Sequence, residues 1–376
     1  MINFNEPPCL GTEIEYVKDA IARKHICGDG YYTKQCNSLL EQHTGSAKAL
    51  LTNSCTAALE MAALLAGIQP GDEVICPSYT FVTTASSFAL RGAKIVFVDI
   101  RDDTLNIDET KIEEAITPKT KVIIPVHYAG VCAEMETILS IAEKHNLMVV
   151  EDAAQGVGSL YKGRFAGSMG DMGCYSFHET KNVSCGEGGA ILINHSDLIE
   201  QAEIVREKGT NRSKFFRGQV DKYTWVELGS SYLPSDMIAA YLYPQLEKMN
   251  EINDRRKMLW NRYNAAFETL KHKGVRRPYC PAECEHNAHM YYLRCPDLET
   301  RSRFIDYMKK NGIICVFHYI PLHSAPAGQK YGRFIGDMSV TNTVSDTLVR
   351  LPLFHGLTEK NQDYIIETAL NFWSKE

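Results

Sequence analysis

Apolar runs of strand length alternate with helix-like stretches through the first half of the chain, and this alternation constrains the fold most. The runs KALLTNS (48–54), KIVFVDI (94–100) and LMVVEDA (147–153) are rich in the apolar residues Val, Ile and Leu. Apolar residues recur at helical spacing in CTAALEMAALLAG (55–67) and METILSIAEKHN (135–146). Buried strands that alternate with helices form a largely parallel sheet covered on both faces. The sequence therefore predicts an α/β fold.

The second half of the chain has a different pattern. A long helical pattern runs through 235–270, where Pro244 predicts a kink or a break. The elements predicted beyond it are a strand at 288–295, a helix at 300–311, a strand at 313–320 and a helix at 360–375. Because 376 residues are too many for one ordinary core, we expect two domains. These are a three-layer large domain over 1–240 and a smaller α+β domain over 241–376, linked by the helical stretch.

Composition and charge exclude several classes of protein. The chain is 44% apolar and 23% charged, as in a soluble globular protein, and carries a net charge of −6. It has no block of Lys and Arg, which argues against nucleic acid and anionic membranes as partners. The sequence shows neither a signal peptide nor an apolar run of about 18 residues. The 12 scattered cysteines are expected to be reduced thiols, which is typical of the cytoplasm. We therefore expect a cytoplasmic protein that acts on a small molecule.

One cluster of possible metal ligands needs weighing. The segment CPAECEHNAH contains Cys280, Cys284, His286 and His289 within ten residues. Their spacing is tighter than that of ordinary zinc modules, and the segment leads directly into a strand-like run. We therefore interpret it as a polar loop, and we expect no metal site. Signatures of P-loops, dinucleotide-binding folds, nucleophile elbows and HExxH metalloproteases are also absent from the sequence.

Two segments place polar side chains where predicted strands end. In TNSCTAALE a strand end passes through Ser54, Cys55 and Thr56 into a helix, whose first N–H groups favour an anion such as phosphate. Plain N-capping of that helix is an equal alternative. In VVEDAAQG the next candidates are Asp152 and Gln155, and ligands of open α/β sheets bind beyond the carboxyl ends of strands. N-capping by Asp152 is the alternative there.

The third segment, SFHETKNVSCGEGG (176–189), places Lys181 between a strand-like run and a glycine-rich turn. Most lysines are solvated surface residues. Here small residues and glycines surround the lysine, and a lysine that forms a Schiff base needs a desolvated setting that lowers its pKa. A phosphate cup, an acid for a pyridine nitrogen and such a lysine are the three things that pyridoxal 5′-phosphate (PLP) requires. Their order along an α/β chain predicts a PLP enzyme.

These residues carry a resemblance to a known family. Through SCTAALE, PSYTFVTTA, VHYAG, EDAAQ, SFHETKN, GEGG and HYIPLH, the chain resembles the DegT/DnrJ/EryC1/StrS aminotransferases. The resemblance implies the aspartate-aminotransferase-like fold type I of PLP enzymes. It also implies a homodimer with shared active sites, L-glutamate as the amino donor, and a nucleotide-linked 4-keto-6-deoxyhexose as the acceptor.

The resemblance also implies roles for individual residues. Lys181 matches the Schiff-base lysine, Asp152 the partner of the pyridinium nitrogen and Gln155 the residue near the ring hydroxyl. Phe81 matches the aromatic that stacks on the ring, with core packing as its alternative. The expected phosphate-binding residues are Ser54, Cys55, Thr56 and Ser176. His178, Tyr319 and His323 match positions near the substrate, although a structural role is nearly as plausible for each of these three.

Two features leave alternatives open. Arg212, Arg217 and Lys222 offer positive charge for a nucleotide diphosphate, with solvated surface charge as the equal alternative. Ser231 stands where many relatives have an Asn that reaches the partner subunit's phosphate, and we expect the serine hydroxyl to make this cofactor contact instead. A sibling enzyme that acts at C3 or on a UDP-sugar is the first alternative function. The second is a PLP-binding regulator without turnover.

Overall fold

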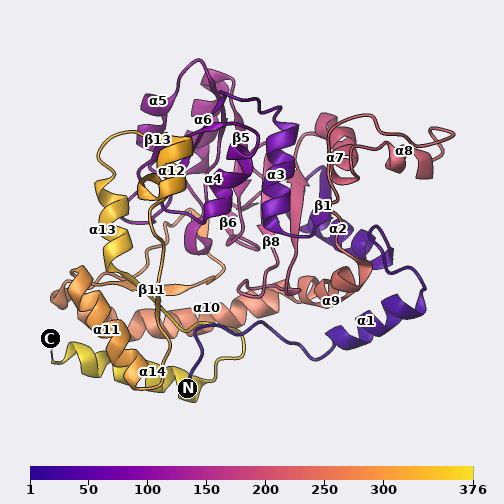
Figure 1. Ribbon diagram of the computed structural model, residues 1–376. Coiled ribbons are helices and arrows are strands. Elements are labelled where there is room, and N and C mark those ends of the chain that lie inside the picture. The colour runs from indigo at the N-terminus through magenta and orange to yellow at the C-terminus, as the bar shows by residue number, and fades with distance from the viewer. Residues whose placement is uncertain (376) are drawn as a thin grey trace.

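The computed structural model describes residues 1–375, and an eight-stranded sheet forms its centre (Figure 1). The strands follow in the order β1 (Lys48–Thr52), β9 (Gly189–Ile193), β8 (Met172–Ser176), β5 (Met148–Asp152), β4 (Thr120–Ile123), β2 (Glu73–Pro77), β3 (Lys94–Val98) and β13 (Gly332–Phe334). Only β9 runs antiparallel to its neighbours. The prediction of a largely parallel sheet is confirmed.

Helices cover both faces of this sheet because successive residues of each strand point to opposite faces. One face packs against α2 (Tyr31–Thr44), α5 (Ile112–Ala115), α6 (Met135–His145) and α9 (Asp236–Glu247). The other face packs against α3 (Cys55–Leu65), α4 (Val82–Ala89) and α7 (Ile199–Arg206). Along β2, for example, Ile75 belongs to the first core and its neighbours Val74 and Cys76 belong to the second. The result is the three-layer arrangement that the sequence predicts.

A separate core lies in the C-terminal part of the chain. The antiparallel strands β11 (Tyr291–Arg294), β14 (Leu348–Leu351) and β12 (Val316–Phe317) pack with α10 (Met249–Ala266), α11 (Leu298–Lys310) and α14 (Glu359–Trp373). The remaining helices are α1 (Glu13–Ala22), α8 (Arg212–Phe216), α12 (Pro326–Tyr331) and α13 (Ser339–Thr347). A small third sheet consists of β6 (Leu160–Tyr161), β7 (Arg164–Phe165) and β10 (Cys284–Glu285). In Figure 1, α11 and α14 lie at the opposite end of the molecule from α7 and α8.

Three details differ from the sequence-based prediction. The helical stretch breaks at Lys248, between α9 and α10, whereas Pro244 lies inside α9 without ending it. The carbonyl of Pro244 still accepts a hydrogen bond from the Lys248 N–H, so the turn that follows the proline forms normally. The strand predicted at 313–320 shrinks to two residues of β12, and β13 joins the large sheet by pairing with β3.

The direction of the strands decides where a site can form. The strands β1, β2, β4, β5 and β8 run the same way, so their carboxyl ends lie along one edge of the sheet. Polar residues follow several of these ends, namely Ser54 after β1, Asp152 at the end of β5 and Ser176 at the end of β8.

None of the helices within residues 1–375 combines the length and apolar character that a membrane span requires.

Candidate active site

A cavity of about 520 Å³ opens at this edge of the sheet. It is within the size range of small-molecule sites. Ten residues predicted from the sequence line it together: Ser54, Cys55, Thr56, Phe81, Asp152, Gln155, Ser176, His178, Lys181 and Tyr319. The lining also includes side chains of the C-terminal part, so the cavity lies between the large sheet and the C-terminal core.

The start of α3 forms one wall of the cavity. Ser54 is the N-cap, and its Oγ accepts a hydrogen bond from the N–H of Ala57 at 3.1 Å. A Cβ on Gly189 would lie 2.4 Å from the carbonyl carbon of Ser54, so only glycine lets β9 pack against this turn. The glycine-rich segment therefore serves to seat the turn at Ser54. The helix dipole and the free N–H groups beyond the N-cap favour an anionic ligand there.

Asp152 points into the cavity from the end of β5. Its Oδ2 accepts a hydrogen bond from Thr84 Oγ1 at 2.6 Å, and its Oδ1 accepts one from the N–H of Ala154 at 3.1 Å. Gln155 is held in turn, because its Oε1 accepts the N–H of Ala129 at 2.7 Å and its Nε2 donates to the Tyr319 hydroxyl at 3.3 Å. The carboxylate and the amide are thus both fixed in orientation.

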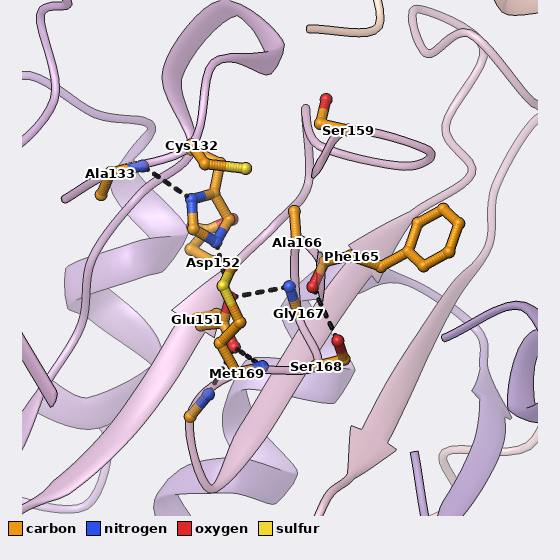
Figure 2. Close-up of polar contacts among 12 residues, drawn as sticks. Cys132, Ala133, Glu151, Asp152, Ser159, Phe165, Ala166, Gly167, Ser168 and Met169 are labelled. Carbon is orange, nitrogen blue, oxygen red and sulfur yellow. Dashed lines mark hydrogen bonds and ion pairs between the residues drawn. The ribbon is translucent and has the colours of Figure 1, made fainter. Parts of the chain in front are cut away.

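The neighbouring Glu151 points into the core and anchors this strand end. Its carboxylate accepts hydrogen bonds from the N–H groups of Gly167, Met169 and Gly170 at 2.6–2.7 Å. It also pairs with His127 Nε2 at 2.8 Å, while His127 Nδ1 accepts the N–H of Ala133. Figure 2 shows the loop from Phe165 to Met169 wrapped around Glu151. A buried carboxylate with this many donors is well satisfied and rigid.

Lys181 lies on the loop between β8 and β9, five residues after the end of β8. Its N–H donates to the carbonyl of His178 at 2.9 Å, which closes a tight turn. The next residue, Asn182, is buried and donates to Asn253 Oδ1 and to the carbonyl of Asn287, both at 2.8 Å. The turn and the Asn182 anchor hold the lysine at the cavity wall.

Electrostatics in the cavity favour an uncharged lysine. Burial lowers the pKa of Lys181, and the positive charge of Arg350 lowers it further, against the opposing effects of Cys55 and Asp152. Burial also holds the pKa values of His289 and His318 well below their ordinary value, so both imidazoles are neutral. A lysine with a lowered pKa is more readily available as a nucleophile and base.

Five residues that the sequence predicts as site residues do not line the cavity of their own subunit. Arg212 pairs with Glu207 at 3.0 Å, and Arg217 pairs with Glu203 at 2.8 Å; both line a separate cavity. His323 Nδ1 contacts Ser78 Oγ at 2.8 Å. The two remaining candidates, Lys222 and Ser231, are exposed, and the carbonyl of Ser231 accepts a hydrogen bond from Asn53 at 3.3 Å.

Three of the four possible metal ligands of segment 280–289 have different neighbours. Cys284 Sγ contacts the carbonyl of Cys132 at 3.7 Å, and the His286 ring lies 4.5 Å from that of Trp260. His289 Nδ1 contacts Asn182 Oδ1 at 3.1 Å. Within residues 1–375, no group of three or more His, Cys, Asp or Glu side chains could hold a metal ion.

Sequence reasoning missed three residues that shape the site. They are Thr84, which hydrogen-bonds Asp152, Asn182, which anchors the lysine loop, and Arg350, which lines the cavity from β14. Asn182 directly follows Lys181, so its position was an available signal. Thr84 lies in PSYTFVTTA, one of the motifs that carry the family resemblance, so it too could have been found. Arg350 lies in an unremarkable segment, and only the folded chain brings it to the cavity.

The site fits PLP by its chemistry. It combines a helix N-terminus with uncharged donors for a phosphate, a fixed carboxylate for a protonated ring nitrogen and a lysine of lowered pKa. Phe81, whose side chain is 54% exposed, lies at the same cavity and offers a ring face for stacking. Fold and site together define a PLP enzyme of the aminotransferase class.

Comparison with known proteins gives the family. Residues 9–370 match the DegT/DnrJ/EryC1/StrS aminotransferase family, and the chain belongs to it. The spore coat polysaccharide biosynthesis protein SpsC of Bacillus subtilis is 35% identical over 96% of this chain and 95% of its own length.

Solved structures agree with this assignment. The aminotransferase TlmJ from Streptoalloteichus hindustanus has a TM-score of 0.92 at 28% identity, over 100% of this chain and 99% of that one. Spr1654 of Streptococcus pneumoniae in its PLP form has a TM-score of 0.90 at 30% identity, with coverage of 100% and 99%. It has also been solved in a PMP form. The fold is therefore the fold type I of PLP-dependent aminotransferases, and PLP is the cofactor, both as the sequence predicts.

The lowered pKa of Lys181 gives a stability test on protein freed of cofactor. At neutral pH, Lys181→Met should raise the free energy of unfolding, because it removes a buried group whose charged form is disfavoured. The unfolded chain binds more protons than the folded one between the lowered pKa and the ordinary value of 10.5, so wild-type stability rises with pH there. The advantage of Lys181→Met should shrink across that window.

Urea unfolding of both proteins at several pH values between about 7 and about 10 measures the difference in their free energies of unfolding. This pH range approaches the ordinary pKa of lysine. A difference that stays constant with pH would show that Lys181 titrates normally in the folded protein.

Proposed function

We propose that this protein is a PLP-dependent sugar-nucleotide aminotransferase. The observation that carries the proposal is the convergence of Lys181, Asp152 and the α3 N-terminus on one cavity. The similarity to Spr1654, which carries the assignment of a sugar aminotransferase, and to the polysaccharide biosynthesis protein SpsC supports a sugar as the acceptor.

Each residue has a distinct task in this reaction. Bound PLP would supply a ring that accepts electrons and an aldehyde carbon that can carry the amino group between donor and acceptor. Lys181, as a free amine, removes the proton from the α-carbon of the donor and later returns a proton to the product. Asp152 keeps the ring nitrogen protonated, and Thr84 fixes that carboxylate. Ser54, Cys55, Thr56 and Ser176 hold the phosphate, Phe81 stacks on the ring, and Gln155 meets the ring hydroxyl.

For the particular substrate we propose dTDP-4-keto-6-deoxy-D-glucose, aminated at C4 with L-glutamate as donor. The product would be dTDP-4-amino-4,6-dideoxy-D-galactose, a precursor of surface polysaccharide of the enterobacterial common antigen type. The support is sequence resemblance to the transaminase of that reaction through REKGTNRS (206–213), FFRGQVDKYTW (215–225) and NAHM (287–290). His178, Tyr319 and His323 are the proposed contacts near the sugar, with Arg212 and Lys222 nearest the diphosphate.

Product analysis tests the proposal. Incubation with PLP, L-glutamate and dTDP-4-keto-6-deoxyglucose should yield 2-oxoglutarate and the galacto-configured 4-amino sugar, identified by NMR. Asp152→Asn is the matched control of nearly equal shape. It should keep the cofactor and lose roughly 100-fold or more in kcat, because a neutral amide cannot stabilise the ring proton.

Amination at C3, or a preference for the UDP-sugar, would reject the particular substrate and leave the class of reaction standing. Protein that binds PLP without exchanging its amino group with glutamate would reject the aminotransferase proposal and favour a regulator.

We further propose that the protein is a homodimer whose subunits share their active sites. The run 221–231 is exposed throughout, and Trp225 in it has 73% of its surface exposed. Phe81 at the cavity and its neighbour Val82 are also more than half exposed, and exposed apolar clusters are typical of interfaces. Ser231 does not line the cavity of its own subunit. In the proposed dimer its hydroxyl reaches the phosphate of the PLP bound in the partner subunit.

Subunit mixing tests the shared site. Lys181→Ala lacks the essential lysine, and Ser231→Asp places a negative charge against the phosphate from across the interface. Each variant alone should be inactive. A mixed dimer holds one site with both defects and one with neither, so activity should return to about half the wild-type level if the sites are independent. Sedimentation must first show a dimer at the assay concentration, and exchange of subunits must be confirmed separately. Exchange without recovered activity would show that Ser231 serves its own subunit.

A further inference from the structure

Cysteines from two distant segments of the chain lie together beside the small third sheet. Cys284, the first residue of β10, and Cys132, between β4 and α6, are both buried. The Sγ of Cys284 lies 3.7 Å from the carbonyl oxygen of Cys132, and the two thiols also interact through a side-chain hydrogen bond. Folding thus brings together two thiols that are 152 residues apart in the sequence. The aminotransferase reaction uses neither of them.

The two thiols differ in acidity. Hydrogen bonds from the side chain and the backbone of Cys132 lower the pKa of Cys284, although burial opposes this effect. The hydrogen bond between the side chains, together with burial, raises the pKa of Cys132 well above its ordinary value. The thiolate is the nucleophilic form of cysteine. Cys284 is therefore the thiol that reacts first with an oxidant, and Cys132 is placed to react second.

We infer that Cys132 and Cys284 form a reversible disulfide when the protein meets hydrogen peroxide, and that this disulfide slows amino-group transfer. The Cys284 thiolate attacks one peroxide oxygen and breaks the O–O bond, which gives a sulfenic acid and hydroxide. The Cys132 thiol then attacks that sulfur, forms the S–S bond and releases water. The hydroxide takes up the proton that Cys284 had lost. In sum, two thiols and one peroxide give one disulfide and two waters, and a dithiol reductant reverses the change.

A third cysteine of the same segment is the competing partner. Cys280 is half-buried, and its Sγ contacts the carbonyl oxygen of Cys284 at 3.4 Å. Burial raises the pKa of Cys280 to about 11, so this thiol is mostly protonated at neutral pH. Cys280 also lines a cavity of about 600 Å³, through which a small neutral oxidant can reach the segment. The hydrogen bond between the thiols of Cys284 and Cys132 favours Cys132 as the partner of Cys284.

The chain that follows Cys284 connects the pair to the catalytic lysine. The carbonyl of Asn287 accepts a hydrogen bond from Asn182 at 2.8 Å, and His289 Nδ1 contacts Asn182 Oδ1 at 3.1 Å. Asn182 directly follows Lys181. The sulfurs of a disulfide lie about 2 Å apart, closer than two thiols in contact, so bond formation must move Cys284 and the residues after it. Because a misplacement of about 1 Å can cost much of a catalytic rate, we expect the disulfide to slow the reaction.

Disulfide mapping of the wild-type holoenzyme tests the pair without any variant. The reduced protein is treated with hydrogen peroxide, its free thiols are alkylated, and it is digested without reduction by trypsin and a glutamate-specific protease. Cleavage after Glu283 separates Cys280 from Cys284. Mass spectrometry should show a peptide that links Cys132 to Cys284 and that disappears after treatment with dithiothreitol. A link from Cys284 to Cys280, or no link from Cys284 at all, would overturn the inference.

The half-reaction with L-glutamate measures the effect on the active site, because absorbance of the cofactor follows it without an acceptor sugar. Oxidised wild type should react at least about tenfold more slowly than the reduced protein, and dithiothreitol should restore the rate. Cys132→Ala and Cys284→Ser should react like reduced wild type, with or without peroxide. Oxidised wild type that carries the disulfide and keeps its full rate would contradict the inference.

Cys280→Ser is the matched control, because it removes a thiol of the same cluster and should stay as sensitive to peroxide as wild type. If Cys132→Ala and Cys284→Ser also lost rate on oxidation, the sensitive thiol would lie elsewhere, for example at Cys55, and the inference would be wrong. Cofactor content and thermal unfolding check that each variant is folded. Disulfide mapping needs neither glutamate nor a sugar, so its result is independent of whether the proposed function holds.

Discussion

Two adjacent carboxylates on β5 face opposite ways, and the site depends on this division. Glu151 turns into the core, where three backbone N–H groups and His127 hold it (Figure 2). Asp152 therefore turns toward the cavity, because neighbouring residues of a strand point to opposite faces. Glu151 thereby holds the loop 165–170 and the end of β5 in place beside the cavity wall. A catalytic carboxylate needs this rigidity, since loose placement costs rate.

The charges of the cavity follow a consistent pattern. The turn at Ser54 offers uncharged donors and a helix dipole, so it can neutralise a phosphate without adding a full positive charge. The two strongly basic side chains of the lining, Lys181 and Arg350, are both desolvated, and burial lowers the pKa of each. The neutral His289 and His318 add no charge to the lining.

The sequence predicted those features that depend on chain order. Alternating periodicity indicated the sheet, and Ser54, Asp152 and Ser176 follow from being placed at strand ends. Features that depend on distant pairing were not predictable. The short strand β13 forms only by pairing with β3, and Thr84 reaches Asp152 from the start of α4. No strand was predicted around Arg350, and the pairing of β14 with β11 and β12 brings it to the cavity. The helix break at Lys248 also escaped prediction, because α9 accommodates Pro244.

The central claim is that Lys181 is the residue that joins the cofactor covalently. The most direct measurement is borohydride reduction of the PLP-loaded protein, followed by proteolysis and mass spectrometry of the peptides. The account predicts one pyridoxyl group per subunit, on the peptide that contains SFHETKN (176–182) and at Lys181 itself. A pyridoxyl group on another lysine, or none after reduction of protein that visibly binds PLP, would contradict it.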